Sequence, residues 1–166
     1  MENLLTKTLL RELLSESRTT KKILSQVPDN KYSWQPHEKS MTVQRLANHV
    51  AELHTWVTTI LTTDELNFDT MDYKPNGASN SRETLAFFES CLESARDSLE
   101  KATDEKLQEP WQILAGGKVY IKSTRGDMIS NTLNHIVHHR AQLGVYLRLL
   151  DVPLPGSYGP SADEAP

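Results

Sequence analysis

The sequence predicts an all-α protein, a four-helix bundle with long inter-helix loops and a non-helical C-terminal tail. Apolar residues recur every three or four positions in four stretches, as in helices that bury one face. Between these stretches, segments 62–80 and 103–123 are rich in polar residues, glycine and proline. Prolines and glycines dominate residues 153–160, which disfavours a helix there. The 166 residues match the usual length of one domain, so we predict a single helical-bundle domain over 1–166.

The charge balance and the single cysteine limit the partners and the location that we expect. The chain has 18 Lys and Arg against 22 Asp and Glu, and no dense basic block that would neutralise phosphates, so we expect no nucleic-acid partner. No apolar run approaches the roughly 18 residues of a membrane span, so we expect no membrane association. Cys91 cannot form an internal disulfide, and the first residues lack the pattern of a secretory signal. Both observations favour the cytoplasm, and we interpret Cys91 as a buried structural thiol.

The first predicted helix, 2–26, is apolar over a wide arc. Its leucines cover more than the roughly 100° stripe of a helix that packs on one side. Such a helix either lies centrally in the bundle or has a second apolar face in a dimer interface, and the pattern leaves both open. The leucines are Leu4, Leu5, Leu9, Leu10, Leu13 and Leu14.

The second predicted helix runs from Ser40 or Thr42, either of which can cap it, to about Leu61. Its apolar residues recur at helical spacing throughout. The segment that follows, 62–80, is predicted to be a loop. It exceeds the usual length of a helix–helix connection, which favours a covering or functional role.

The third predicted helix is capped by Ser79 or Ser81 and runs to about Ala102. The segment after it contains Gly116-Gly117 directly before Lys118-Val119-Tyr120-Ile121. Two glycines before a β-branched and aromatic run predict a short hairpin or an extended crossing segment.

The fourth predicted helix, from about Thr124 to Leu150, carries three histidines, His135, His138 and His139. The imidazoles of His135 and His139, four residues apart, stack on one helix face, a spacing found in helices that bind a metal ion. On a helical projection, His139 falls inside the apolar stripe and His135 on its border, so both are directed towards the interior. His138 points away from that stripe, and we assign it no role.

A catalytic metal site usually takes three protein ligands, and the second helix offers two candidates for the third. His49 and His54 lie on either side of its apolar arc, and periodicity alone does not choose between them. A different interpretation also stays open, in which the buried imidazoles satisfy their nitrogens within the core and bind no metal. His37 lies in a connector and receives no role.

No catalytic residue is predicted. Glu52 and Asp127 are candidate general bases only because they are close in sequence to the histidines, and solvated charges are the favoured interpretation. Phosphate-binding glycine loops and a nucleophile elbow are missing from the sequence.

Several segments are informative as motifs beyond their histidines. They are Trp34-Gln35-Pro36, Leu46-Ala47-Asn48-His49-Val50 with Trp56, Asn134-His135-Ile136-Val137-His138-His139-Arg140-Ala141-Gln142-Leu143, and Pro153-Leu154-Pro155-Gly156-Ser157-Tyr158-Gly159-Pro160. Together they resemble the DinB/YfiT-like family of metalloenzymes, which is not the lesion-bypass DNA polymerase that shares the name. The resemblance spans nearly the whole chain and is densest over 134–160.

This resemblance implies a DinB-like four-helix bundle with a three-histidine site for a divalent metal ion, nickel or zinc. It selects His49 over His54, and it makes His135 and His139 the other two ligands. Family members often form homodimers, which agrees with the wide leucine arc of the first helix. Relatives resemble both thiol-dependent S-transferases or isomerases and metal-dependent hydrolases.

Three neutral imidazoles leave the charge of a divalent cation uncompensated, which lowers the pKa of a bound water or thiol. We therefore expect a metal-dependent enzyme with a small-molecule substrate, and we favour S-transfer that uses a low-molecular-weight thiol. The alternatives are a metal-dependent hydrolase and a non-catalytic helical-bundle binding module with a structural metal site. We also expect the tail around Tyr158 to dock against the fourth helix, close to Arg140.

Overall fold

The computed structural model describes residues 3–164. Positions 1, 2, 165 and 166 of the predicted domain, including the first residue of the predicted helix 2–26, lie outside the described residues. The elements in chain order are α1 (Leu4–Leu24), the 3-10 helix η1 (Asp29–Lys31), α2 (Val43–Glu52), α3 (Thr55–Thr62), β1 (Glu65–Asn67), α4 (Ser81–Lys101), α5 (Asp104–Gln108), β2 (Pro110–Ala115), β3 (Lys118–Thr124) and α6 (Arg125–Leu149).

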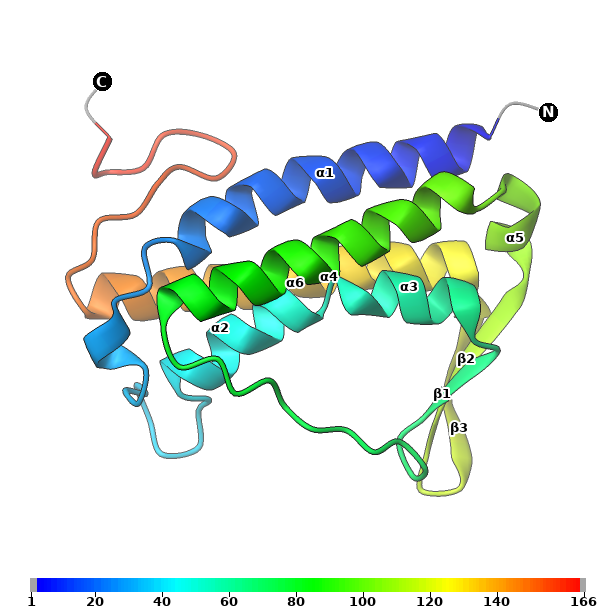
Figure 1. Ribbon diagram of the computed structural model, residues 1–166, viewed down its shortest axis with the longest axis horizontal. Coiled ribbons are helices and arrows are strands. Elements are labelled where there is room, and N and C mark those ends of the chain that lie inside the picture. Colours follow the sequence, from blue (N-terminus) through cyan, green and yellow to red (C-terminus); the bar gives the residue numbers. More distant parts are fainter. Residues whose placement is uncertain (1–2, 165–166) are drawn as a thin grey trace.

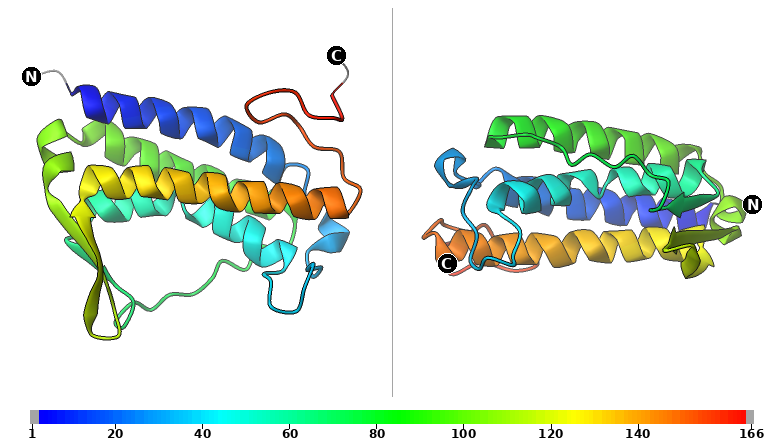
Figure 2. Two further views of the ribbon diagram at one scale, coloured as in Figure 1. Left: turned by 180° about the vertical axis from the view of Figure 1, so that it is seen from behind. Right: turned by 90° about the horizontal axis from the view of Figure 1, so that it is seen from below.

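The predicted all-α four-helix bundle is wrong, because residues 3–164 form six α-helices together with a three-stranded mixed sheet. The chain is therefore an α/β protein. The helices α4 and α6 each pack against α1 and against the pair α2–α3, so the long helices lie side by side (Figure 1). The sheet projects from one end of these helices. The C-terminal tail lies at the opposite end, where it folds back beside α1 (Figure 2).

The sheet arises in the two segments between the predicted helices. Strands β2 and β3 form the hairpin that was one of the two predictions for 103–123, and Gly116 and Gly117 at its turn both have positive φ. Strand β1 pairs in parallel with β2, so the loop prediction for 62–80 is wrong at Glu65–Asn67. Three residues are too few to show a strand's alternation in sequence, and β1 forms because β2 offers an edge with unpaired backbone groups.

The segment between β1 and α4 is anchored at both ends. The carboxylate of Asp69 accepts hydrogen bonds from the N–H groups of Gly116 (2.9 Å) and Gly117 (2.8 Å), and these bonds hold its pKa below the ordinary value. Further along, the Asn48 side chain of α2 donates to the carbonyl of Ala78 at 2.9 Å. The segment consequently runs along the helices from the sheet back to the start of α4 (Figure 1).

The second predicted helix is interrupted, which the apolar periodicity does not show. The hydroxyl of Thr55 donates to the carbonyl of Glu52 at 2.7 Å. The N–H of Trp56, which would bind that carbonyl in a continuous helix, binds the carbonyl of Leu53 at 3.1 Å. A local side-chain hydrogen bond thus competes with the backbone ladder, and α2 ends at Glu52.

Of the two helix caps predicted from the sequence, that of α2 is confirmed and that of α4 is wrong. Thr42 caps α2 and Thr124 caps α6, each by accepting a backbone N–H on its side-chain oxygen. The cap of α4 is Asn80 rather than Ser79 or Ser81. Asparagine is at least as good an N-cap as serine, so neighbouring residues of this kind cannot be ranked from sequence.

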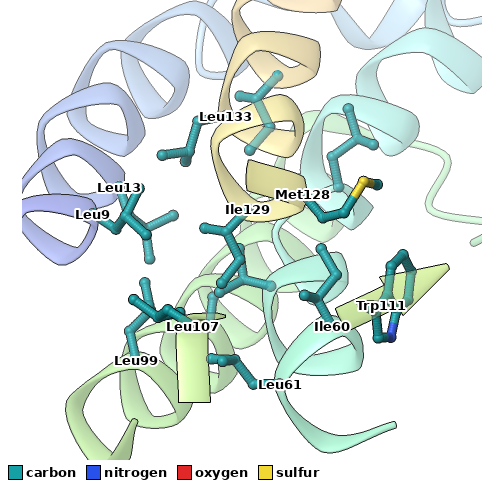
Figure 3. Packing of buried hydrophobic residues seen from close by; sticks show 14 of the residues in the cluster. Leu9, Leu13, Ile60, Leu61, Leu99, Leu107, Trp111, Met128, Ile129 and Leu133 are labelled. Carbon is teal, nitrogen blue, oxygen red and sulfur yellow. The ribbon is translucent and has the colours of Figure 1, made fainter. Parts of the chain in front are cut away.

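The core consists of two apolar clusters along the helices. The cluster at the sheet end joins α1, α3, α4 and α6 to Leu107 of α5 and Trp111 of β2, both fully enclosed (Figure 3). The second cluster surrounds Phe88 and Tyr32 at the other end. Within the described residues, no helix combines the length and the apolar character needed to cross a membrane.

Candidate metal centre

Three histidines from two helices meet at the junction of α2 and α6. His49 lies on the last turn of α2, and His135 and His139 lie one turn apart in the middle of α6. Their candidate ligand atoms all lie within 4.8 Å of one another, and the Nε2 atoms of His135 and His139 are 2.8 Å apart. Imidazole nitrogens that share one ion lie roughly 3 Å apart, given metal–nitrogen distances of about 2.0–2.1 Å. The side chains are thus close to the spacing that a shared ion requires.

Two of the three rings are oriented by a hydrogen bond at Nδ1. His49 Nδ1 lies 2.6 Å from Glu52 Oε1, and His139 Nδ1 lies 2.7 Å from Gln142 Oε1. Both partners are acceptor oxygens, so Nδ1 carries the proton and the lone pair of each neutral ring is at Nε2. This is the tautomer that a metal ion needs, and it is set by the side-chain partner as in many metal sites.

The surroundings of His135 and His139 keep these two imidazoles neutral. Burial, reinforced by the neighbouring histidines, lowers the pKa of His135 to about 4. Burial also lowers the pKa of His139, and the hydrogen bond to Gln142 only partly opposes this effect. Neutral imidazoles are the form that binds a metal, so the donor set fits a divalent cation.

Glu52 is part of the centre and not the solvated charge favoured from the sequence. Its Oε1 atom accepts hydrogen bonds from His49 Nδ1, from Tyr73 Oη at 2.7 Å and from Arg45 Nη1 at 3.1 Å. Burial alone would raise the pKa of Glu52, but the three hydrogen bonds outweigh it and the pKa is lowered. The signal that could have identified Glu52 is its position three residues after His49, on the same face of α2.

Two of the three histidines of the cluster are partly accessible to solvent. His49 and His135 are half-buried, whereas His139 is buried. The Trp56 ring of α3 stands edge-on to His135, with ring centroids 6.3 Å apart, and Phe68 lies beyond it at 6.4 Å from Trp56. An aromatic wall therefore borders the centre, and the half-buried rings leave a route for a small molecule.

The remaining histidines lie outside the cluster. His54 is fully buried at the junction of α2 and α3, where its Nδ1 faces the carbonyl of Ala51 and its ring stands edge-on to Phe88. His138 is exposed on α6, and His37 binds the backbone of its own connector. His37, His54 and His138 are not among the grouped ligand atoms, although the His138 ring stands edge-on to His139 with ring centroids 5.0 Å apart.

The structure also shows the surroundings of Asp127 and Cys91, the other two residues considered in the sequence analysis. Asp127 lies in the first turn of α6, exposed and hydrogen-bonded to Ser123, and is not among the residues of the centre. Burial, with a smaller effect of the charge on Glu52, raises the pKa of Cys91 to about 12. Cys91 is therefore a protonated, buried thiol, in agreement with the structural interpretation.

The tail docks where the sequence analysis expects it. Arg140, a buried residue of α6, donates to Tyr158 Oη at 2.9 Å and forms an ion pair with Glu16 of α1 at 2.7 Å. Tyr158 Oη also donates to Glu16 at 2.8 Å. Arg140 faces α1, whereas His139 faces α2, so the tail is attached on a different side of α6 from the histidines.

Fold and site together define a helical protein with a small sheet and a three-histidine cluster fit for a metal ion. The chain belongs to the DinB family, whose model matches residues 1–165, and this confirms the family resemblance found in the sequence. No curated protein matches the chain.

Solved structures of DinB-like proteins share the fold of this chain. A DinB-like protein from Bacillus cereus superposes with a TM-score of 0.70 at 20% identity, covering 92% of this chain and 97% of its own. A DinB-like protein from Bacillus subtilis gives a TM-score of 0.68 at 20% identity, covering 92% of this chain and 99% of its own. At this identity the likeness concerns the fold.

Proposed function

We propose that the chain binds one divalent metal ion, nickel or zinc, through the Nε2 atoms of His49, His135 and His139. The observation that carries the proposal is the convergence of three imidazoles whose ligand atoms lie within 4.8 Å of one another. Among residues 3–164, this group contains no fourth histidine, cysteine or carboxylate. Three protein ligands on a site that is half-buried are typical of catalytic rather than structural metal sites.

The residues of the chain would each have a defined task in such a site. Glu52 holds His49 in the tautomer that leaves Nε2 available, and Gln142 does the same for His139. Trp56 limits the access of water on the side of His135. A divalent ion bound by three neutral ligands would supply an uncompensated positive charge, which lowers the pKa of a coordinated water or thiol.

We infer that the reaction is S-transfer from a low-molecular-weight thiol to a small electrophilic substrate. The thiol loses its proton, its sulfur forms a bond to the electrophilic carbon, and the leaving group departs with the bonding electron pair. Family membership, the buried and protonated state of Cys91, and the access to the centre support a thiol that comes from solution. If the protein hydrolyses its substrate without any thiol, it is a metal-dependent hydrolase and the S-transfer assignment is wrong.

The decisive experiment is metal stoichiometry by elemental analysis on untagged protein. We expect about one nickel or zinc ion per chain in the wild type, none in His139→Ala, and an unchanged value in His138→Ala. His138 is the matched control because it is an exposed histidine of the same helix. If the wild type remains metal-free after incubation with both ions at neutral pH, the enzyme assignment fails.

The reaction class is tested on the metal-loaded protein with 1-chloro-2,4-dinitrobenzene. S-transfer requires added thiol and releases chloride as the thioether forms. Turnover of ester or amide substrates in the absence of thiol would instead identify a hydrolase. If the protein binds metal, resists chelation and shows neither activity, we would conclude that it is a binding module with a structural metal.

We also propose that the protein is a homodimer and works in the cytoplasm. Leu4 and Leu5 of α1 are exposed, and the half-buried Leu10 and Leu14 line a groove of about 290 Å³ together with Lys7, Arg11 and Arg18. Leucines that reach the surface along one helix are typical of an interface between copies. The single buried Cys91 is compatible with a reducing compartment.

A further inference from the structure

A small pocket lies beside the candidate metal centre, between α3, α4 and the segment that joins β1 to α4. Its volume is about 270 Å³. Its apolar and aromatic walls are formed by Trp56, Leu66, Met71 and Phe87, and the rest of its lining carries polar groups. Pockets for drug-sized ligands span roughly 300–1,000 Å³, so this one fits a molecule with a single ring.

The pocket shares residues with the metal centre. Trp56 forms one wall, and the same ring borders His135 at 6.3 Å between centroids. Glu52 and Tyr73 also line the pocket, and both belong to the hydrogen-bond network that holds His49. A molecule in the pocket would therefore lie against residues that the centre uses.

The carboxylate of Glu52 has one oxygen that the protein does not use. Its three donors, His49, Arg45 and Tyr73, all bind Oε1. Oε2 receives no hydrogen bond from the described residues, and it is not one of the two fully enclosed atoms without a partner, Ser17 Oγ and His54 Nε2. An ionised oxygen in a buried residue is a strong acceptor when no donor competes for it. Glu52 Oε2 is thus an available acceptor in a pocket that also has apolar and aromatic walls.

The other charge at the pocket is already compensated. Lys74 lies at the rim and forms an ion pair with Asp72 at 3.1 Å, and both side chains are largely exposed. The remaining polar lining includes Thr59, whose hydroxyl donates to the carbonyl of Thr55. The ion pair between Glu52 and Arg45 uses only Oε1, so Oε2 is left as the acceptor that a ligand with a donor group would meet.

We propose that this pocket binds a single-ring aromatic molecule that carries a hydroxyl or protonated amine. The ring lies against Trp56, Met71 and Phe87, and the donor group reaches Glu52 Oε2. The role of the pocket as a substrate subsite rests on the function proposed above. The binding itself does not, because every residue that it uses is present without a metal.

The test is calorimetric or NMR titration of metal-free and nickel-incubated protein with benzylamine, benzyl alcohol and benzoate. We expect dissociation constants on the order of 1 mM for the amine and the alcohol, and no measurable binding of benzoate, whose carboxylate faces that of Glu52. Equal binding of all three probes would overturn the assignment of Glu52. Because the metal-free protein is tested too, a failure to bind nickel does not affect this result.

Variants locate the binding. Thr59→Phe fills the pocket and should weaken amine binding about tenfold or more, whereas Thr62→Phe, at the exposed end of α3, should leave it unchanged. Glu52→Gln replaces the acceptor by a donor and should have a similar effect. If circular dichroism shows that Thr59→Phe is misfolded, Met71→Lys on the exposed segment replaces it. Unchanged binding in folded pocket variants would show that the probes bind elsewhere.

Discussion

His49 Nδ1 lies 2.6 Å from Glu52 Oε1, and the same oxygen also receives hydrogen bonds from Tyr73 and Arg45. The carboxylate of Glu52 orients the imidazole of His49, and hydrogen bonds from Tyr73 and Arg45 fix the position of that carboxylate. Tyr73 belongs to the segment between β1 and α4, so this segment contributes to the orientation of a candidate metal ligand. The path from His49 to Tyr73 connects the helices to a part of the chain with no regular structure.

Glu52→Gln is expected to weaken nickel or zinc binding about 10–100-fold, the usual effect of losing a partner that orients a ligand. The amide keeps the shape of the side chain but removes the negative charge that supports the His49 bond. Affinity is measured by competition with a chromophoric chelator at neutral pH. Glu93→Gln, at an exposed position of α4, is the control and should bind like the wild type. Equal affinities for both variants would contradict an orienting role for Glu52.

Removal of the metal is expected to lower the thermal stability. At a free metal concentration of 100 times the dissociation constant, binding stabilises the native state by about 2.7 kcal/mol. For a chain of this size that corresponds to roughly 5–10 °C in Tm. Scanning calorimetry with nickel and after EDTA measures the shift. His139→Ala should show no shift; an equal shift in that variant would mean that the ion binds outside the three histidines.

Stability is expected to fall between pH 7 and pH 5 because of His54. Burial lowers its pKa from 6.5 to about 4 in the folded protein, so only the unfolded state takes up a proton in this range. Protons bound by the unfolded state alone favour unfolding, and the free energy of unfolding drops by about 2 kcal/mol over these two pH units. Urea titrations of wild type and His54→Phe at both pH values isolate this contribution. The variant should lose about 2 kcal/mol less than the wild type, and parallel losses would show that His54 does not titrate as stated.

Arg140→Met is expected to destabilise the protein by about 3 kcal/mol, because it leaves the Glu16 carboxylate largely buried without its ion-pair partner. Tyr158→Phe removes only a hydroxyl from the exposed side of the same contact and should cost about 1 kcal/mol. Urea denaturation measures both. A wild-type stability for both variants would show that the tail contributes nothing to the fold.

Leu14→Glu is expected to convert the dimer to a monomer at micromolar concentration, because a carboxylate in place of Leu14 would disrupt the leucine contacts that the dimer proposal places at this groove. Light scattering coupled to size exclusion gives the mass, with circular dichroism as the check on folding. Leu149→Glu, an exposed leucine at the end of α6, is the matched control. A wild-type protein that is monomeric throughout would remove the dimer proposal.

Local patterns predict the helical part of the fold well. The spacing of apolar residues identifies the regions of α1, α4 and α6, and the cap Thr42 of α2 follows from the hydrogen bond that its side chain offers. The placement of His135 and His139 on one interior face also follows from the helical repeat alone. These features depend on residues within one or two turns of each other.

Apart from the cap of α4, the errors concern contacts between residues that are distant in sequence or hydrogen bonds that compete with the helix. Strand β1 has no pattern of its own and exists through pairing with β2, more than 40 residues later. The break after Glu52 depends on a threonine hydroxyl whose preference is invisible to apolar periodicity. The all-α prediction failed because of the sheet, which depends on the pairing between these distant segments.

By itself, the sequence determined the long helices, the family and the pair of histidines on α6, because periodicity and motifs are local properties. Periodicity left His49 and His54 open and the family resemblance selected His49; the tertiary structure shows that His49 meets that pair while the ring of His54 stands against Phe88. Only the tertiary structure decided that Glu52 is a buried partner of His49 rather than a solvated charge. The reason is geometric. Residues on either side of one apolar arc become distinguishable only when the packing of α2 against α6 gives each side a different neighbour.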